Sequence, residues 1–241
     1  TTEIYTLSLH DALPISIISP PEDYEKEAAQ FRAAIEKYSD VPVRTILNLG
    51  CGGGHIDFHL KENYDVTGVD ISDGMLGNAR KLNPGVEYLK DDMRFADLGR
   101  QFDAVIIADS IIYMLSHQDL QAAFRTAFAH LKPGGIFCTY IEELPGEFTE
   151  STYTHQARKR GACEITLIEH KWDPDPTDMG FEFLFIYIIN ESGNVRVETD
   201  RHRCGLFPLA TWKSLLAESG FRVKSLKPQE TGMVHFLACK K

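Results

Sequence analysis

The chain has 241 residues, of which 43% are hydrophobic and 25% charged, and its formal net charge is −10. This composition is typical of one globular domain with a sizeable core, and the acidic balance disfavours a nucleic-acid partner, which would require a basic surface. Five scattered cysteines without a CxxC pair disfavour disulfides and a zinc site, and they favour a cytoplasmic location. Because no apolar run reaches the roughly 18–20 residues of a membrane span, we expect no membrane association.

The N-terminal segment differs from the rest of the chain. Residues 5–15, YTLSLHDALPI, resemble the in-frame translation of a sequencing adapter, which indicates an assembly artefact in a metagenomic sequence. An ordinary leader is the alternative. We therefore expect residues 1–16 to be an artefactual leader and residues 17–241 to form a single domain.

Helices and strands alternate over the next part of the chain. Ser19 and Glu22 have the spacing of a capping box, which predicts a helix over 22–38. Buried strands are expected at 44–50, 65–70, 86–90, 102–109 and 135–141, with helices between them. The last of these helices, 119–131, is expected to end before the Pro-Gly-Gly of 133–135. This alternation predicts an α/β fold with a doubly wound, mostly parallel sheet.

Residues 143–205 interrupt the alternation. The segments 165–172, 181–189 and 195–202 are rich in β-formers, and a turn-like sequence separates the last two. They predict a small antiparallel insert after strand five, which we expect to cover the substrate. A helix at 208–219 and strands at 221–226 and 233–239 are expected to close the chain.

The glycine-rich segment LNLGCGGGH, residues 47–55, follows a buried strand and precedes a helix. Glycines at Gly50, Gly52 and Gly54 allow the main chain to turn sharply and approach a ligand. His55 stands where a dinucleotide fingerprint has glycine, which disfavours NAD and FAD. A structural turn or another nucleotide site is the alternative.

Two acidic positions follow the next strands. Asp70 ends a strand twenty residues after Gly50, where a carboxylate can accept the ribose hydroxyls of a nucleoside. A capping role is the alternative, although Ser72 is available as the cap. After the third strand, Asp92 can accept an adenine amino group and Met93 can pack on the ring; a solvated acidic turn is the alternative.

In this order and spacing, LNLGCGGG, VDIS, KDDM, FDAVIIADS and HLKPGG resemble the class I S-adenosylmethionine-dependent methyltransferases, strongly over residues 20–142. The resemblance implies a Rossmann-like seven-stranded sheet with its last strand antiparallel, S-adenosyl-L-methionine as cofactor and S-adenosyl-L-homocysteine as product. It also implies cofactor contacts from Asn48, Gly50, Cys51, Gly52, Gly54, Asp70, Ile71, Met75, Asp92, Met93, Ala108, Asp109 and Ser110.

Two departures from this family pattern stand out. Asn48 occupies a position where the family usually has an acidic residue. Residues 21–31 and 201–221 are similar to the bacterial amino-sugar N-methyltransferase and glycine N-methyltransferase-like group, in which an N-terminal segment supplies a tyrosine over the cofactor. Adapter-like sequence replaces that segment here.

The expected reaction is direct in-line methyl transfer to an amine or hydroxyl of a small molecule, with alignment as the main contribution of the protein. From their positions after the strands, Glu142 and His202 are candidate bases and Tyr140 is a candidate orienting group. A cofactor-binding protein without transferase activity, whether a regulator or an inactive truncation, is one alternative. A dehydrogenase or another nucleotide-dependent enzyme is a second.

Other charged groups have less specific interpretations. His55 and His59 are four residues apart but lack a third ligand, so we expect ordinary helix histidines and no metal. The basic residues of 158–160 lie either on a solvated face or against an anionic substrate group. Arg201, His202 and Arg203 form either an exposed turn or part of the functional site. Tyr113 is expected near the substrate or in the core. A monomer or a homodimer is expected.

Overall fold

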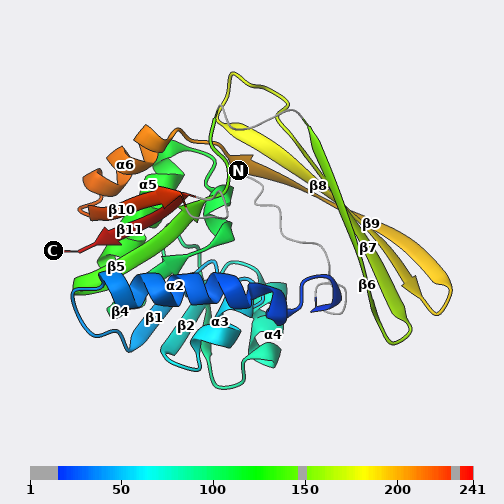
Figure 1. Cartoon of the computed structure of the whole chain (residues 1–241), viewed down its shortest axis with the longest axis horizontal. Helices are drawn as coiled ribbons and strands as arrows, with labels where there is room; N and C mark the ends of the chain where they lie inside the picture. The colour runs from blue at the N-terminus through cyan, green and yellow to red at the C-terminus, as the bar shows by residue number, and fades with distance from the viewer. Residues whose placement is uncertain (1–15, 146–150, 229–233, 241) are drawn as a thin grey trace.

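The computed structural model describes residues 16–145, 151–228 and 234–240, so the adapter-like residues 5–15 lie outside the described part. The larger of two sheets has the strand order β10-β11-β5-β4-β1-β2-β3 (Figure 1). Strands β1 to β5 run parallel, whereas β11 is antiparallel to both β5 and β10. The prediction of seven strands with the last one reversed is therefore confirmed. The strands are β1 (Thr45–Leu49), β2 (Asp65–Asp70), β3 (Glu87–Lys90), β4 (Phe102–Ile107), β5 (Leu131–Ile141), β10 (Arg222–Pro228) and β11 (Val234–Cys239).

Helices cover both faces of this sheet because each presents an apolar stripe to it. The cluster on one face includes Phe31, Ile35 and Leu60, and the cluster on the other includes Phe124 and Trp212. The helices of the first face are α2 (Glu25–Tyr38), α3 (His55–Leu60) and α4 (Asp73–Leu82), and those of the second are α5 (His117–Ala129) and α6 (Leu209–Glu218). Two 3-10 turns, η1 (Pro21–Tyr24) and η2 (Asp109–Tyr113), precede α2 and α5.

Two local expectations were wrong. The predicted capping box does not form, because the chain enters through the 3-10 turn η1 and α2 has no side-chain cap. The Pro-Gly-Gly segment does not follow the end of a helix, because α5 ends at Ala129 and β5 already begins at Leu131. The segment lies at a register shift of β5 instead.

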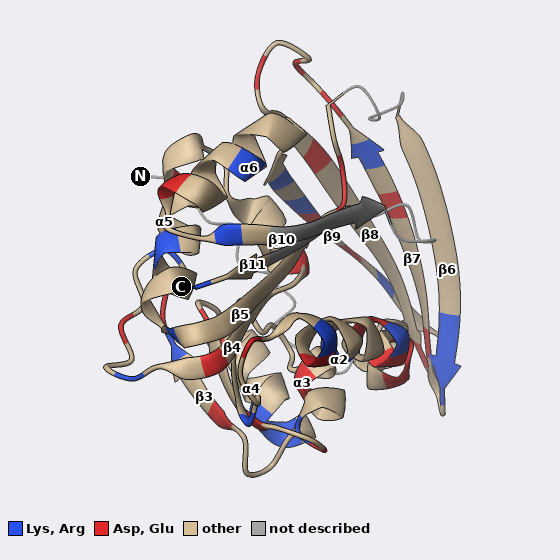
Figure 2. Cartoon of the chain, turned by 60° about the vertical axis from the view of Figure 1, so that its left-hand side comes forward, with Lys and Arg blue, Asp and Glu red and all other residues tan. Residues whose placement is uncertain are grey.

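A second, four-stranded antiparallel sheet stands beside the first (Figures 1 and 2). It contains β6 (Thr152–Arg160), β7 (Cys163–Trp172), β8 (Gly180–Glu191) and β9 (Asn194–Gly205), in that order. The predicted antiparallel insert is thus confirmed, but β6 was missed. This edge strand has mostly exposed, polar side chains and so lacks the alternation that identifies half-buried strands.

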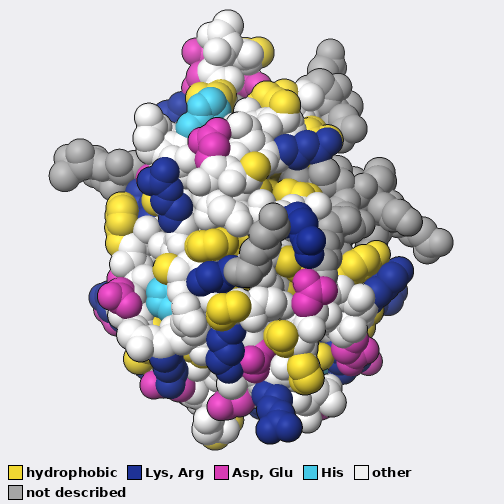
Figure 3. Space-filling view, turned by 90° about the vertical axis from the view of Figure 1, so that its left-hand side faces the viewer, with side chains coloured by type: hydrophobic (Ala, Val, Ile, Leu, Met, Phe, Trp, Pro, Cys, Tyr) yellow, Lys and Arg dark blue, Asp and Glu magenta, His cyan; other side chains and the backbone are white. Residues whose placement is uncertain are grey.

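The described part of the chain contains no helix that is both long and apolar enough to cross a bilayer. All five cysteines are buried. On the side of the molecule turned away from the second sheet, basic, acidic and hydrophobic side chains are interspersed (Figure 3).

Candidate functional site

A cavity of about 560 Å³ lies between the carboxyl ends of the parallel strands and the second sheet. Asn48, Asp70 and Ala108, near the ends of β1, β2 and β4, line one side. Leu167, Phe185 and other residues of β7 to β9 line the opposite side. Open α/β sheets bind ligands at this edge, since the strand order reverses there.

The glycine loop between β1 and α3 forms the floor of the cavity. Gly50, Gly52 and Gly54 have φ angles of +73°, +53° and +74°, which L side chains rarely adopt. A Cβ on Gly50 would overlap the side chains of Ser110 and Met93. Gly54 lies beneath the loop, where its own Cβ would come within 2.6 Å of buried polar atoms. The loop is therefore restricted to glycine for different reasons at different positions.

Asp70 closes the loop from the neighbouring strand. Its Oδ2 accepts a hydrogen bond from the Gly52 amide at 2.8 Å, and its Oδ1 accepts one from Ser72 at 2.8 Å. Burial raises the pKa of Asp70, while the bonds from these amides oppose the rise. The capping alternative is wrong, because Ser72 is the N-cap of α4 and accepts from the Met75 amide.

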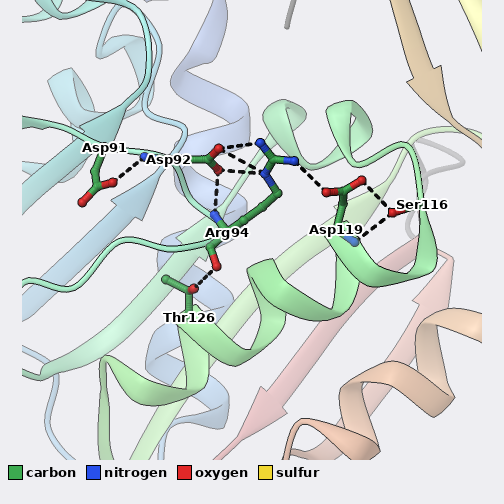
Figure 4. Close-up of polar contacts among 6 residues, drawn as sticks. All are labelled: Asp91, Asp92, Arg94, Ser116, Asp119 and Thr126. Carbon is green, nitrogen blue, oxygen red and sulfur yellow. Dashed lines mark hydrogen bonds and ion pairs between the residues drawn. The ribbon is translucent and has the colours of Figure 1, made fainter. Parts of the chain in front are cut away.

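The turn after β3 is fixed by a half-buried ion-pair network. Arg94 holds Asp92 at 2.6 Å and Asp119 at 2.6 Å, and its carbonyl accepts from Thr126 (Figure 4). Burial favours the neutral form of Asp92, but the hydrogen bonds and charge of Arg94 outweigh it and lower the pKa. The turn is therefore ordered rather than a solvated acidic loop, with Met93 against the core.

A polar network is buried beneath the glycine loop. The Asn48 amide nitrogen donates to Asp57 Oδ1 at 2.7 Å, and the Tyr88 hydroxyl donates to Asp57 Oδ2 at 3.0 Å. Asn83 connects Tyr88 to the Gly54 carbonyl. Burial raises the pKa of Asp57 to about 6, although Asn48 and Tyr88 hydrogen-bond it. The Asn48 Oδ1 is buried without a hydrogen-bond partner among the described residues, and Asn48 lines the cavity.

Three carboxylates converge beside this floor. Glu142 and Asp109 line the cavity, and Glu27 approaches Asp109 from α2. Burial raises the pKa of all three groups, and repulsion by Asp109 raises the pKa of Glu27 and Glu142 further. The Tyr140 hydroxyl donates to Glu27 at 2.9 Å and contacts Asp109. Tyr140 is buried against Phe31 behind these carboxylates, away from the cavity lining.

His202 lies on the opposite wall. It is 2% exposed, and its Nδ1 is 2.9 Å from the Tyr113 hydroxyl. The Tyr113 hydroxyl and Nδ1 share one hydrogen bond, whose direction depends on the tautomer of the histidine. The Nε2 faces Asp200 at 3.3 Å. Tyr113 is 39% exposed because it borders the cavity, which favours the substrate-side interpretation over core packing.

An aromatic wall on the second sheet escaped the sequence analysis. Phe183 and Phe185 stack with ring centroids 5.6 Å apart, Tyr187 continues the row, and all three line the cavity. Glu169 of β7 pairs with Phe185 in the ladder and also lines the cavity. The signal was present in FEFLFIYII, where aromatic residues alternate with the period of a strand and so share one face.

The remaining charged candidates do not form one site. Arg158 pairs with Asp23 at 2.5 Å and Arg201 with Glu182, both away from the cavity lining. His55 stacks on Tyr24, whereas the His59 ring hydrogen-bonds the Pro21 carbonyl. The two histidines thus have separate partners. All the predicted cofactor residues except Gly54 line the cavity, as do Glu142 and His202.

A Rossmann-like sheet with one reversed strand, carrying a glycine loop and an acidic residue on the next strand, defines the class of nucleoside-binding α/β domains. Residues 46–135 match the family described as Methyltransferase domain. The chain is 26% identical over 232 residues to the dTDP-3-amino-3,4,6-trideoxy-alpha-D-glucopyranose N,N-dimethyltransferase of Streptomyces venezuelae, covering 95% of this chain and 96% of that protein.

Two solved structures share the fold. DesVI from Streptomyces venezuelae superposes with a TM-score of 0.87 at 24% identity, covering 98% of this chain and 100% of that one. CalS10, an amino pentose methyltransferase from Micromonospora echinaspora solved with SAM bound, gives a TM-score of 0.76 at 21% identity and covers 91% of each chain. Residues 46–135 therefore form a methyltransferase domain, and the whole chain has the fold of S-adenosylmethionine-dependent methyltransferases.

Proposed function

We propose that this enzyme methylates the amine nitrogen of a small molecule related to an amino sugar. The observation that carries the proposal is a single cavity with two different walls. The glycine loop, Asp70 and the half-buried Glu142 belong to the side of the seven-stranded sheet, and His202 lies across from them on the second sheet. A donor and an acceptor that occupy the same cavity can react without diffusing apart.

The residues of the first wall fit S-adenosylmethionine. The loop leaves a cradle that side chains would fill, and the buried, unpartnered Asn48 Oδ1 offers an acceptor for an ammonium donor. We assign the ribose to Asp70, the adenine to Met93 and Asp92, and the methionine end to Asn48, Gly50 and Ser110. When bound, the cofactor supplies an electrophilic methyl group, so the protein has no leaving group to activate.

The carboxylates favour an amine over a hydroxyl acceptor. An amine arrives as an ammonium ion, which is attracted to acidic groups and must lose a proton before it can attack. Glu142 lines the cavity and is the candidate base. The relative from Streptomyces venezuelae is named as an N,N-dimethyltransferase, which also supports nitrogen as the methylated atom.

The other two candidates receive more limited roles. His202, fixed between Tyr113 and Asp200, is a second candidate base on the opposite wall. Tyr140 is a positioning residue that acts through Asp109 and Glu27, because it does not line the cavity. Direct contact between Tyr140 and an acceptor, as expected from the sequence, is not supported by this placement.

Methyl transfer from radiolabelled S-adenosylmethionine tests the proposal. The acceptor panel would contain amino sugars, small amines and the same sugars with hydroxyl in place of the amine. We expect label only in products that carried the amine. Binding of S-adenosylhomocysteine without transfer to any amine, or transfer to the hydroxyl analogues, would overturn it.

A further inference from the structure

The acceptor half of the cavity has a distinct chemical character. Aromatic side chains from β8, Phe183, Phe185 and Tyr187, form its flat wall. Glu169 stands beside them on β7, and Glu142 is close enough for its charge to repel that of Glu169. Aromatic faces combined with carboxylates form the environment that proteins use to bind organic cations.

Both arginines in the described part of the cavity lining are already paired with carboxylates. Among the described residues that line the cavity, the two arginines are Arg94 and Arg203. Arg94 is bound by Asp92 and Asp119, and Arg203 is bound by Asp178 at 2.7 Å. Phosphate groups are usually held by arginine or lysine side chains that are free to form charge-assisted hydrogen bonds. The described lining offers no such group.

Acidic residues outnumber the basic ones. The carboxylates of the lining are those of Asp70, Asp91, Asp92, Asp109, Asp119, Glu142 and Glu169. Burial already raises the pKa of Glu142 and Glu169, so a diphosphate beside them would find two acidic groups and no unpaired arginine or lysine in the described lining. It would raise both pKa values further, whereas an ammonium group would lower them. An ammonium group would meet opposite charge on more than one side.

We propose that the acceptor is a small cationic amine without phosphate, its ammonium group held near Glu142 and Glu169 and its carbon skeleton against the aromatic wall of β8. This inference rests on the proposed amine methylation and specifies its substrate class. It separates this chain from the Streptomyces venezuelae relative, whose name specifies a dTDP-linked sugar.

Two probes with the same amine distinguish an acceptor without phosphate from a dTDP-linked one. They are methyl 3-amino-3,6-dideoxy-α-D-glucopyranoside and the corresponding dTDP-linked amino sugar. Each is added to the full chain with S-adenosylhomocysteine for calorimetry, and with S-adenosylmethionine for turnover. We expect the glycoside to bind and to be methylated at least ~10-fold more efficiently than the dTDP form. Its affinity should fall as salt is raised, because the attraction is electrostatic.

Variants on one strand provide the matched control. Glu169→Gln should weaken glycoside binding about 10-fold without changing the affinity for S-adenosylhomocysteine. Glu164→Gln should change neither, because Glu164 is exposed on the other face of β7. Glu169→Lys should shift the preference toward the dTDP-linked probe.

Tighter binding of the dTDP form to the unmodified enzyme, or equal effects of the two glutamine variants, would overturn the inference. If the proposed amine methylation is itself wrong, the experiment gives a different result. In that case both probes stay unmethylated, yet calorimetry with the glycoside, and with dTDP alone, still decides whether the pocket accepts a cation or a diphosphate.

Discussion

The two sheets contribute to the cavity in different ways. The seven-stranded sheet presents main chain, because the glycine loop brings backbone amides to the cavity and Asp70 fixes one of them. The four-stranded sheet presents side chains, which reach the cavity from alternate positions along its strands. Geometry at the first wall is thus set by φ angles, and at the second wall by strand register.

This difference determines which positions tolerate substitution. A ligand that lies against backbone requires fixed spacing and small residues, so nearly any substitution disturbs it. A wall of side chains can change its chemistry while the strands stay in place. We therefore expect cofactor binding to be sensitive to single substitutions in the loop, and acceptor choice to depend on the residues of β7 to β9.

The largest effect is expected from Gly52→Ala. If this variant bound the cofactor normally, the contrast between a backbone wall for the cofactor and a side-chain wall for the acceptor would be wrong. A Cβ on Gly52 meets no protein atom within 4 Å, and Gly52 lines the cavity. The methyl group should therefore obstruct the cofactor rather than the fold. We expect calorimetry to show at least a ~100-fold loss of S-adenosylhomocysteine affinity, equivalent to about 2.7 kcal/mol.

Gly161→Ala is the matched control. Gly161 also has a positive φ, +61° against +53°, and also has open space around its Cβ position, but it lies in the turn between β6 and β7. Both variants should lose a similar amount of stability, about 1–2 kcal/mol from left-handed strain. Unchanged cofactor affinity in Gly52→Ala would show that the loop does not contact the ligand.

Glu142→Gln is expected to affect turnover and leave cofactor binding intact. Loss of a general base lowers the rate by about 100-fold or more. Because burial raises the pKa of Glu142, the group becomes an active base only well above the usual carboxylate range, so kcat/KM should rise with pH through neutrality. The Gln variant should lose that part of the pH profile, leaving only the titration of the amine itself.

The same carboxylate predicts a change in stability. A pKa raised in the folded state means that the native protein binds more protons than the unfolded chain. The free energy of unfolding therefore falls as pH rises above the ordinary carboxylate range, and Glu142→Gln should reduce this fall. Wild-type turnover in the variant at every pH would assign the base to another residue, His202 being the next candidate.

Asp70→Ala tests the side-chain contribution to the cofactor wall. It removes hydrogen bonds to a charged group, worth about 1.5–3 kcal/mol, so the affinity for S-adenosylhomocysteine should fall at least ~10-fold. Asp65→Ala, at the exposed start of the same strand, should leave it unchanged. A wild-type dissociation constant for Asp70→Ala would show that Asp70 does not bind the ribose of the cofactor.

The same division explains how much could be predicted from the sequence. The reversed last strand was implied by the family resemblance, whereas the loop and the proximity of Gly52 to Asp70 followed from spacing, because local sequence sets the φ angles and strand ends. Strand β6 could not be predicted, because its exposed polar side chains lack an alternating pattern. The aromatic wall and Glu169 were missed as site residues, because which face of β7 and β8 borders the cavity depends on how the second sheet lies against the first. Tyr140 was misplaced for a similar reason: its side chain points toward α2 rather than into the cavity.

The smallest effect is expected from Asn48→Asp, which would restore the acidic residue that the family usually carries. In this chain the Asn48 amide is 2.7 Å from Asp57, so the substitution would place two buried carboxylates in contact. Like charges at that distance cannot both ionise, and one takes up a proton. The variant should lose about 1–3 kcal/mol of stability in a denaturant titration, with little gain in S-adenosylhomocysteine affinity.

The double variant Asn48→Asp with Asp57→Asn sharpens this test. Exchanging the two side chains keeps one amide and one carboxylate in contact and moves the negative charge to the cavity. We expect it to recover most of the lost stability and to bind S-adenosylhomocysteine more tightly than the single variant, since its amino group then faces a carboxylate. Tighter binding in the single variant, without loss of stability, would show that a carboxylate at position 48 is tolerated beside Asp57.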